Sequence, residues 1–220
     1  RLIYGNYPEL LYLKSPQDRQ EYLYEIINSY LLKDVMIFEM FKNSTKIYNL
    51  LRLIALQIGR EVSYSEIGTQ LGINKSTVEK YLDLFSKVFI IFKLEGYSGN
   101  LRKEVSKSPK WFFYDNGIRN ALIMNFNQPE SRNDTGQLWE NYAISERIKY
   151  QHVNRIYARN YFWRTYDRQE IDLIEDSDGT LKAFELKWNG LKVKPPAAWM
   201  KAYPDSQFRV INRDNFENWV

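Results

Sequence analysis

The sequence predicts a mixed α/β protein, of the α+β or α/β class, in which a helical first half precedes a second half built around a mixed β-sheet. Apolar residues recur at helical spacing through much of residues 18–86. Short apolar runs typical of strands dominate after residue 150. A polar, proline-containing stretch at residues 127–134 separates the two patterns, so we expect a domain boundary there.

Composition limits the class of protein. The chain has 220 residues, 44% of them hydrophobic, which is enough for a substantial core. It has no cysteine, which fits a reducing compartment such as the cytoplasm. No signal peptide and no apolar run of about 18 residues occur, so we expect no membrane association. The net charge of +4 permits nucleic-acid binding without requiring it. Because the chain starts at Arg1, we expect a fragment of a longer protein.

The first predicted element is a long amphipathic helix over residues 18–40. Asp18 is the expected N-cap, and Glu21 follows three residues later, as in a capping box. Residues 1–45 are interpreted as a helical connector to a preceding module.

Three shorter helices are predicted next. An apolar helix over residues 47–58 ends at Gly59. Ser63 opens a capping box and a short helix to Leu71. Gly72 makes a tight turn, and Asn74 is the N-cap of a third helix that runs to about residue 86.

Strands expected at residues 88–94 and 111–114 complete the pattern of a winged helix-turn-helix over residues 46–126. The third helix and the basic loop before the second strand would contact DNA through phosphates rather than base edges. Glu79 and Asp83 offset the positive charge of this helix, so a protein-docking or structural role stays open. The candidate DNA contacts are Lys75, Thr77, Lys80, Arg102 and Lys103.

The second half, residues 134–220, is predicted to begin with a helix over residues 136–150 that Asp134 or Thr135 caps. Glu140 lies on the apolar side of this helix, where a carboxylate is costly to bury without a partner. The elements expected after it are strands at 155–158, 161–166, 170–174 and 181–188, a helix at 196–203 and a strand at 207–211.

A predicted hairpin contains most of the candidate site residues of the second half. Its turn is predicted at residues 175–180, where Asp-Gly separates two apolar runs. Side chains alternate along a strand, so Glu170 and Asp172 are expected on one face, as are Glu185 and Lys187. We expect Ile171, Leu173, Phe184 and Leu186 on the other face. Clustered carboxylates repel unless a cation separates them, which predicts Mg²⁺ or Mn²⁺ at Asp172 and Glu185.

This order of elements resembles the core of the PD-(D/E)XK nuclease superfamily. The resemblance implies that Asp172 and Glu185 are metal ligands, that Glu140 is a third acid, and that Lys187 orients or activates the attacking water. Ile171 stands where the family name has proline, and Glu170 is an additional acid that could compete for the ligand role. A salt-bridge network without an ion is the alternative interpretation of the same residues.

The whole chain also resembles the C-terminal portion of a prokaryotic family of AAA-type ATPases, in which a P-loop module precedes a winged helix and a nuclease-like domain. No Walker A motif occurs here, so ATP is expected only in a module outside this chain. The residues that carry the resemblance are Tyr4-Gly5-Asn6-Tyr7-Pro8-Glu9, Ser29-Tyr30-Leu31-Leu32-Lys33-Asp34, Tyr114-Asp115-Asn116-Gly117, Gly136-Gln137-Leu138-Trp139-Glu140-Asn141, and the pairs EIDLI and FELKW.

Three functions remain compatible with the sequence. The first is a metal-dependent DNA phosphodiesterase that a winged helix guides. The second is a catalytically silent module that binds DNA or a protein partner. The third is a regulatory domain that couples the ATPase module to a partner.

Overall fold

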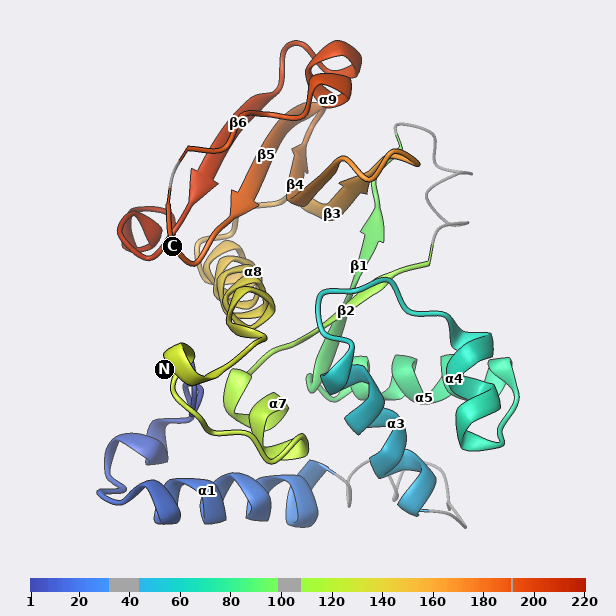
Figure 1. Cartoon of the computed structure of the whole chain (residues 1–220), viewed down its shortest axis with the longest axis vertical. Coiled ribbons are helices and arrows are strands. Elements are labelled where there is room, and N and C mark those ends of the chain that lie inside the picture. The colour runs from blue at the N-terminus through green and yellow to red at the C-terminus, as the bar shows by residue number, and fades with distance from the viewer. Residues whose placement is uncertain (32–43, 99–107, 191) are drawn as a thin grey trace. The chain divides into compact units, whose positions relative to one another are not determined.

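The structure is a computed structural model of the chain, and it describes residues 1–31, 44–98, 108–190 and 192–220. Within these ranges it contains seven α-helices and one mixed sheet of six strands, in the order β2-β1-β3-β4-β5-β6 (Figure 1). The chain divides into two compact units. The first contains Arg1–Lys93 and Lys110–Asn133, and the second contains Leu94–Pro109 and Asp134–Val220.

Helix α1 (Pro16–Glu25) begins earlier than the sequence pattern suggested. The N-cap is Ser15, whose Oγ accepts a hydrogen bond from the Asp18 amide at 3.0 Å, so the expectation that Asp18 is the cap was wrong. Pro16 occupies the first helical position, where its missing N–H is no loss. A π-helical segment, η2 (Ile26–Leu31), follows. The remainder of the predicted helix, residues 32–40, lies outside the described residues.

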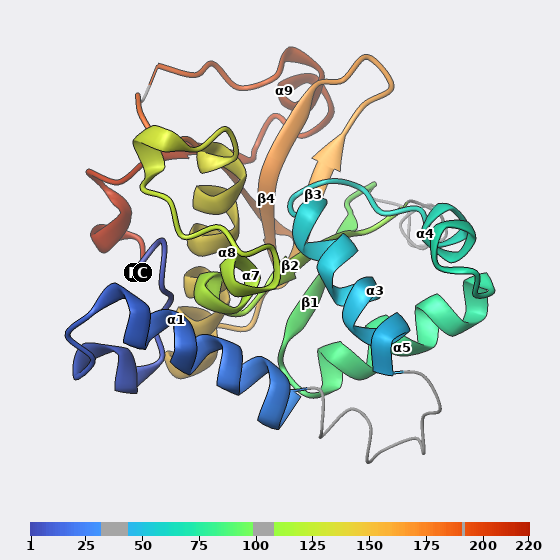
Figure 2. The same cartoon turned by 60° about the horizontal axis from the view of Figure 1, so that its bottom comes forward.

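The next three helices confirm the predicted succession of elements. Figure 2 labels all three, which belong to the first unit. Gly72 ends the second of these helices in the left-handed conformation, with φ of 61°, as a helix C-cap requires. The helices are α3 (Ser44–Leu56), α4 (Tyr64–Leu71) and α5 (Lys75–Lys87).

Side-chain caps start two of these helices as predicted. The Ser63 hydroxyl accepts from the Glu66 amide at 3.4 Å at the start of α4. At the start of α5, the Asn74 side chain accepts from the Thr77 amide at 2.7 Å. These bonds satisfy amides that a helix leaves unpaired in its first turn.

Helix α7 (Asn116–Leu122) brings together two distant motifs of the sequence. Asp115 caps it, because Oδ1 accepts from the Gly117 amide at 2.8 Å, while Oδ2 accepts from the Asn6 amide at 2.7 Å. A Cβ at Gly117 would lie 2.0 Å from the Tyr4 carbonyl oxygen, so only glycine permits this approach. The N-terminal segment is therefore held directly against the start of α7.

Strand β1 (Ile91–Gly96) starts three residues after the predicted position, because Val88 ends α5 and Phe89 adopts a φ of 58°. Strand β2 (Lys110–Phe113) confirms the second predicted strand. Lys110, the first residue of β2, is only 2% exposed, and its backbone forms an isolated antiparallel β-bridge with Glu61.

The second unit combines strands from the C-terminal half with two helices, α8 (Thr135–Val153) and α9 (Ala197–Ala202). The β3–β4 and β4–β5 pairs are antiparallel, whereas β1–β3 and β5–β6 are parallel. No helix among the described residues is long and apolar enough to cross a membrane. The strands are β3 (Arg159–Arg164), β4 (Glu170–Ser177), β5 (Thr180–Leu186) and β6 (Gln207–Ile211).

The predicted strand at residues 155–158 does not form. Helix α8 continues to Val153, so the residues after it are needed to reverse the chain. Arg155 adopts a φ of 55°, and the Ile156 amide donates to the Gln151 carbonyl at 2.8 Å. Strand β3 consequently begins only at Arg159.

The β4–β5 hairpin confirms the Asp-Gly prediction with a tighter turn. Ser177 pairs with Thr180, so only Asp178 and Gly179 make the turn, with φ of 50° and 85°. Two positive φ values are typical of the two-residue turn that fits the twist of a hairpin. Glu175, expected in the turn, instead lies inside β4 and is buried.

A buried ion pair joins α8 to the sheet. Arg147 donates from Nε to Glu175 Oε1 at 2.6 Å and from Nη2 to Oε2 at 3.0 Å. Its Nη1 donates to the carbonyl of Trp219. All three guanidinium nitrogens are thus engaged, and both carboxylate oxygens accept from one partner.

Removal of one partner should be much more costly than loss of an exposed pair. We expect Glu175→Gln to lower the free energy of unfolding by about 3–5 kcal/mol, because it leaves Arg147 charged and buried. Asp83→Asn removes an exposed pair with Lys87, whose side chains are 62% and 69% exposed, and should cost less than about 1 kcal/mol. Urea unfolding measures both, and equal losses would contradict the assigned burial.

Candidate functional site

Asp172 lies at an irregularity in β4. Between Ile171 and Ile174, an advance of three residues along β4 matches an advance of only two along β3. Both isoleucines pack in the cluster around the buried Trp199. The regular alternation is therefore interrupted, and the expectation that Ile171 shares a face with Leu173 was wrong. Such bulges redirect side chains and are frequent beside functional sites.

The redirected Asp172 carboxylate bonds to the backbone of β5. Its Oδ2 accepts from the Leu186 amide at 2.8 Å, in the position where a regular β4 would offer a carbonyl. The pairing of Leu173 with Phe184 places Asp172 beside Glu185, one residue further along the hairpin. The two acids predicted to act together are therefore held together by backbone geometry.

Glu185 and Lys187 form the closest ion pair of the site. Lys187 Nζ lies 2.5 Å from Glu185 Oε1, and Glu185 is only 9% exposed. Burial, followed by the charge of Asp172, raises the pKa of Glu185, and Glu170 adds to the rise. The hydrogen bond and the charge of Lys187 act in the opposite direction without cancelling the effect on this pKa.

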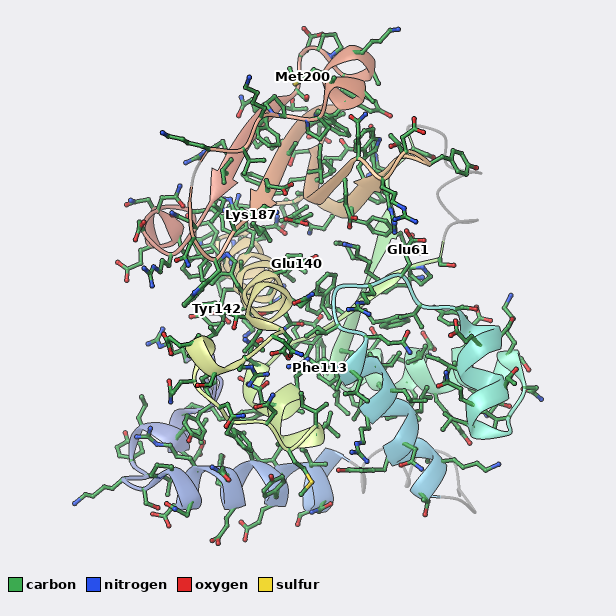
Figure 3. All side chains as sticks on the ribbon, viewed as in Figure 1. Glu61, Phe113, Glu140, Tyr142, Lys187 and Met200 are labelled. Carbon is green, nitrogen blue, oxygen red and sulfur yellow. The ribbon has the colours of Figure 1, made fainter. Side chains whose placement is uncertain are left out.

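The charge of Glu140, the third predicted acid, affects the pKa of Lys187. Burial lowers the pKa of Lys187, but the hydrogen bond to Glu185 and the charges of Asp172, Glu185 and Glu140 outweigh burial and raise it. Helix α8 carries Glu140, and Figure 3 shows the labelled Glu140 and Lys187 in the same part of the second unit. Lys187 is therefore paired with Glu185 and also stabilised as a cation by the charges of Asp172 and Glu140.

The donor set suits a cation that keeps much of its water. No group of three Asp, Glu, His or Cys residues poised around one point exists in the described ranges. Asp172 and Glu185 supply two adjacent carboxylates, and each uses one oxygen for a bond inside the protein. Mg²⁺ is commonly bound through one or two carboxylates with several waters, so these two residues fit it.

The predicted DNA contacts fall into three groups. Lys75 and Lys80 are exposed on α5, as expected. Thr77 is half-buried, and its hydroxyl donates to Asn74 Oδ1 at 2.6 Å, so it serves the helix cap. Arg102 and Lys103 lie outside the described residues.

Several neighbours of the site were missed by the sequence reasoning. Arg164 Nε lies 3.9 Å from Glu170 Oε2, so this extra acid has a cation of its own. Trp188 follows Lys187 directly, and its ring lies 5.7 Å from that of Trp139 on α8. The Trp188 ring is also 5.3 Å from the guanidinium of Arg213. The signal was present in the motif E-x-K-W, whose tryptophan was read only as the end of a strand.

Substitutions should shift the pKa of Glu185 in opposite directions. Asp172→Asn should lower it, because a neighbouring negative charge is removed, and Lys187→Met should raise it, because a positive charge and a hydrogen bond are lost. Glu170→Gln should lower it less than Asp172→Asn does, since Glu170 is the smallest contributor. Carboxyl ¹³C NMR titration measures all three. If Asp172→Asn leaves the pKa of Glu185 unchanged, the proximity of these two acids is contradicted.

Two family models match the chain. One is described as "Domain of unknown function (DUF8612)" and matches residues 1–129, more than half of the chain. The other is described as "Domain of unknown function (DUF4143)" and matches residues 135–215. No solved structure gives a significant match.

Relatives occur in bacteria and archaea. An uncharacterized protein of Mycobacterium tuberculosis is 23% identical over 185 residues, which cover 83% of this chain and 41% of that protein. An uncharacterized protein of Methanocaldococcus jannaschii is 22% identical over 239 residues, which cover 99% of this chain and 52% of that protein. The chain thus spans about half or less of the length of these relatives. By the match to its first 129 residues, it belongs to the family described as Domain of unknown function (DUF8612).

Proposed function

We propose that the second unit is a metal-dependent phosphodiesterase module of the PD-(D/E)XK type that acts on DNA. The observation that carries the proposal is the adjacency of Asp172 and Glu185, with Lys187 Nζ 2.5 Å from Glu185. The order of the elements around these residues supports the fold assignment. The helix with Glu140 precedes strands β3 to β6, and α9 lies between β5 and β6.

The charges of the site define the roles of its residues. Asp172 and Glu185 would hold Mg²⁺ or Mn²⁺, which would neutralise negative charge and lower the pKa of a bound water. Because the pKa of Lys187 is raised, this lysine stays protonated at neutral pH. It therefore acts as a hydrogen-bond donor that orients water and stabilises negative charge on phosphate oxygens, not as a base. The charge of Glu140 also favours the protonated form of Lys187.

The first unit is proposed to be a winged helix-turn-helix that brings DNA to the second unit. The capped helices α4 and α5, the left-handed Gly72 between them and the following strand β1 support this assignment. Its contacts would be to phosphates, through the exposed Lys75 and Lys80.

The longer parent is proposed to be an AAA-type ATPase, and this chain its C-terminal portion. The chain covers only 41% of its Mycobacterium relative, which leaves room for such a module. Two of the motifs behind the resemblance meet in the structure, where Asp115 holds the Asn6 amide. The coding sequence preceding Arg1 tests this, since a P-loop motif there supports the assignment and its absence contradicts it.

A second candidate is a catalytically silent module that binds DNA or a protein. The observation in its favour is that the ammonium of Lys187 already occupies Oε1 of Glu185, so the acids are partly neutralised without a metal. The exposed Glu79 and the exposed pair Asp83–Lys87 also reduce the positive charge of α5.

Metal titration and a cleavage assay separate the two functions. We expect the wild type to bind Mn²⁺ or Mg²⁺ at millimolar concentration by calorimetry and to gain thermal stability on binding. Asp172→Ala should abolish binding, whereas Asp205→Ala, which removes an exposed acid of the same unit, should not. Lys187→Ala should reduce DNA cleavage by about 10²-fold, and Lys201→Ala should leave it unchanged. If the wild type binds neither Mn²⁺ nor Mg²⁺, and if Lys187→Ala leaves DNA cleavage unchanged, the silent module is favoured.

DNA binding by α5 should depend strongly on salt. Lys75→Gln combined with Lys80→Gln should reduce the slope of log K against log [salt] by about 2, because two phosphate contacts are lost. The loss should be the same for unrelated DNA sequences, since phosphates carry no sequence information. Fluorescence anisotropy at a series of salt concentrations gives this slope. An unchanged slope would remove α5 from the DNA contact.

A further inference from the structure

A cavity of about 220 Å³ lies in the second unit, over β5 and β6 and away from the candidate metal ligands. Paired residues of these two strands form its floor. Lys182 pairs with Gln207, and Phe184 pairs with Arg209. Residues two apart on neighbouring strands project from one face, so Lys182 and Arg209 project into the same space. Tyr150 of α8 and Trp219 near the C-terminus provide walls.

Among its lining residues the cavity has cations and no acid. Glu175 lies directly opposite Lys182 in the β4–β5 register, but Arg147 holds both of its carboxylate oxygens. Across the described residues, the side chains of Lys182 and Arg209 make no hydrogen bond or ion pair. Neither of these two cations therefore has an ion-pair partner in this part of the protein.

The wall of the cavity is rigid. The Arg147 guanidinium is 5.3 Å from the ring centre of Tyr150 and 5.1 Å from that of Trp219. It also donates to the Trp219 carbonyl, which holds the C-terminal segment against α8. Wall side chains that are already held by such contacts reduce the ordering that ligand binding would require.

We propose that this cavity binds a phosphate group. Its volume is below the range typical of sites for whole drug-sized ligands, which suits a small anion. Arg209 offers a planar fork of donors and Lys182 a compact ammonium, the two cation types that bind phosphate oxygens. The amides of Gln207 and Asn218 add neutral donors at the rim. The phosphate comes either from a small molecule or from the backbone of a nucleic acid.

The site can be tested without disturbing the fold. Lys182→Gln combined with Arg209→Gln removes the two unpaired charges and leaves Arg147 and Glu175 intact. Lys192→Gln combined with Lys201→Gln removes the same charge from exposed positions of the same unit that do not line the cavity. Thermal unfolding verifies that both double variants are folded. The single variant Arg209→Gln replaces the first double variant if that one fails to fold.

Calorimetric titration with inorganic phosphate at constant ionic strength gives the readout. We expect saturable binding by the wild type, at least tenfold weaker binding by the cavity variant, and unchanged binding by the control. If phosphate does not bind at 50 mM (about the upper limit of useful titration), or if the cavity variant binds as well as the wild type, the site is overturned.

A competition experiment identifies the source of the phosphate. A labelled single-stranded oligonucleotide without a terminal phosphate is titrated with each variant in calcium-free, magnesium-free buffer. Loss of its binding in the cavity variant and displacement by inorganic phosphate indicate a backbone phosphate. Phosphate binding without any effect of the variant on the oligonucleotide indicates a small-molecule phosphate. The result is independent of the metal site, since Asp172→Ala should leave phosphate binding unchanged.

Discussion

The second unit depends on the buried ion pair between Arg147 and Glu175. Arg147 lies on α8, Glu175 lies within β4, and the same guanidinium reaches the carbonyl of Trp219 at the C-terminus. One side chain thus joins a helix, a strand and the chain end. Two charges removed from water need good geometry and additional hydrogen bonds, and here each guanidinium nitrogen donates and both carboxylate oxygens accept. The pair connects α8, which also carries Glu140, to β4.

The same pair has a consequence for charge elsewhere in the sheet. Because both oxygens of Glu175 are committed to Arg147, the lysine across the hairpin, Lys182, is left without a carboxylate. Carboxylates gather around Lys187 near the start of β4, while unpaired cations lie over β5 and β6. A cluster of acids suits a cation, and a cavity lined by basic residues suits an anion.

The irregularity in β4 has a comparable role for the carboxylates. A regular strand would have bonded to Leu186 through a carbonyl and left Asp172 to alternate with its neighbours. The extra residue instead lets the Asp172 side chain take that bond and brings its charge beside Glu185. The electrostatic result is the raised pKa of Glu185, which arises from burial and from Asp172. The irregularity in β4 thus places the carboxylates of Asp172 and Glu185 beside each other.

Local patterns were sufficient for much of the fold. The caps at Ser63 and Asn74 and the Asp-Gly hairpin follow from interactions within a few residues, and sequence reasoning found them. The sequence by itself also determined which acids belong together, because the hairpin register pairs their strands. Tertiary structure alone decided the bulge at Asp172 and the burial of Glu175. Each of these depends on partners distant in the chain or on the length of a neighbouring element, and neither periodicity nor spacing along the sequence records such contacts.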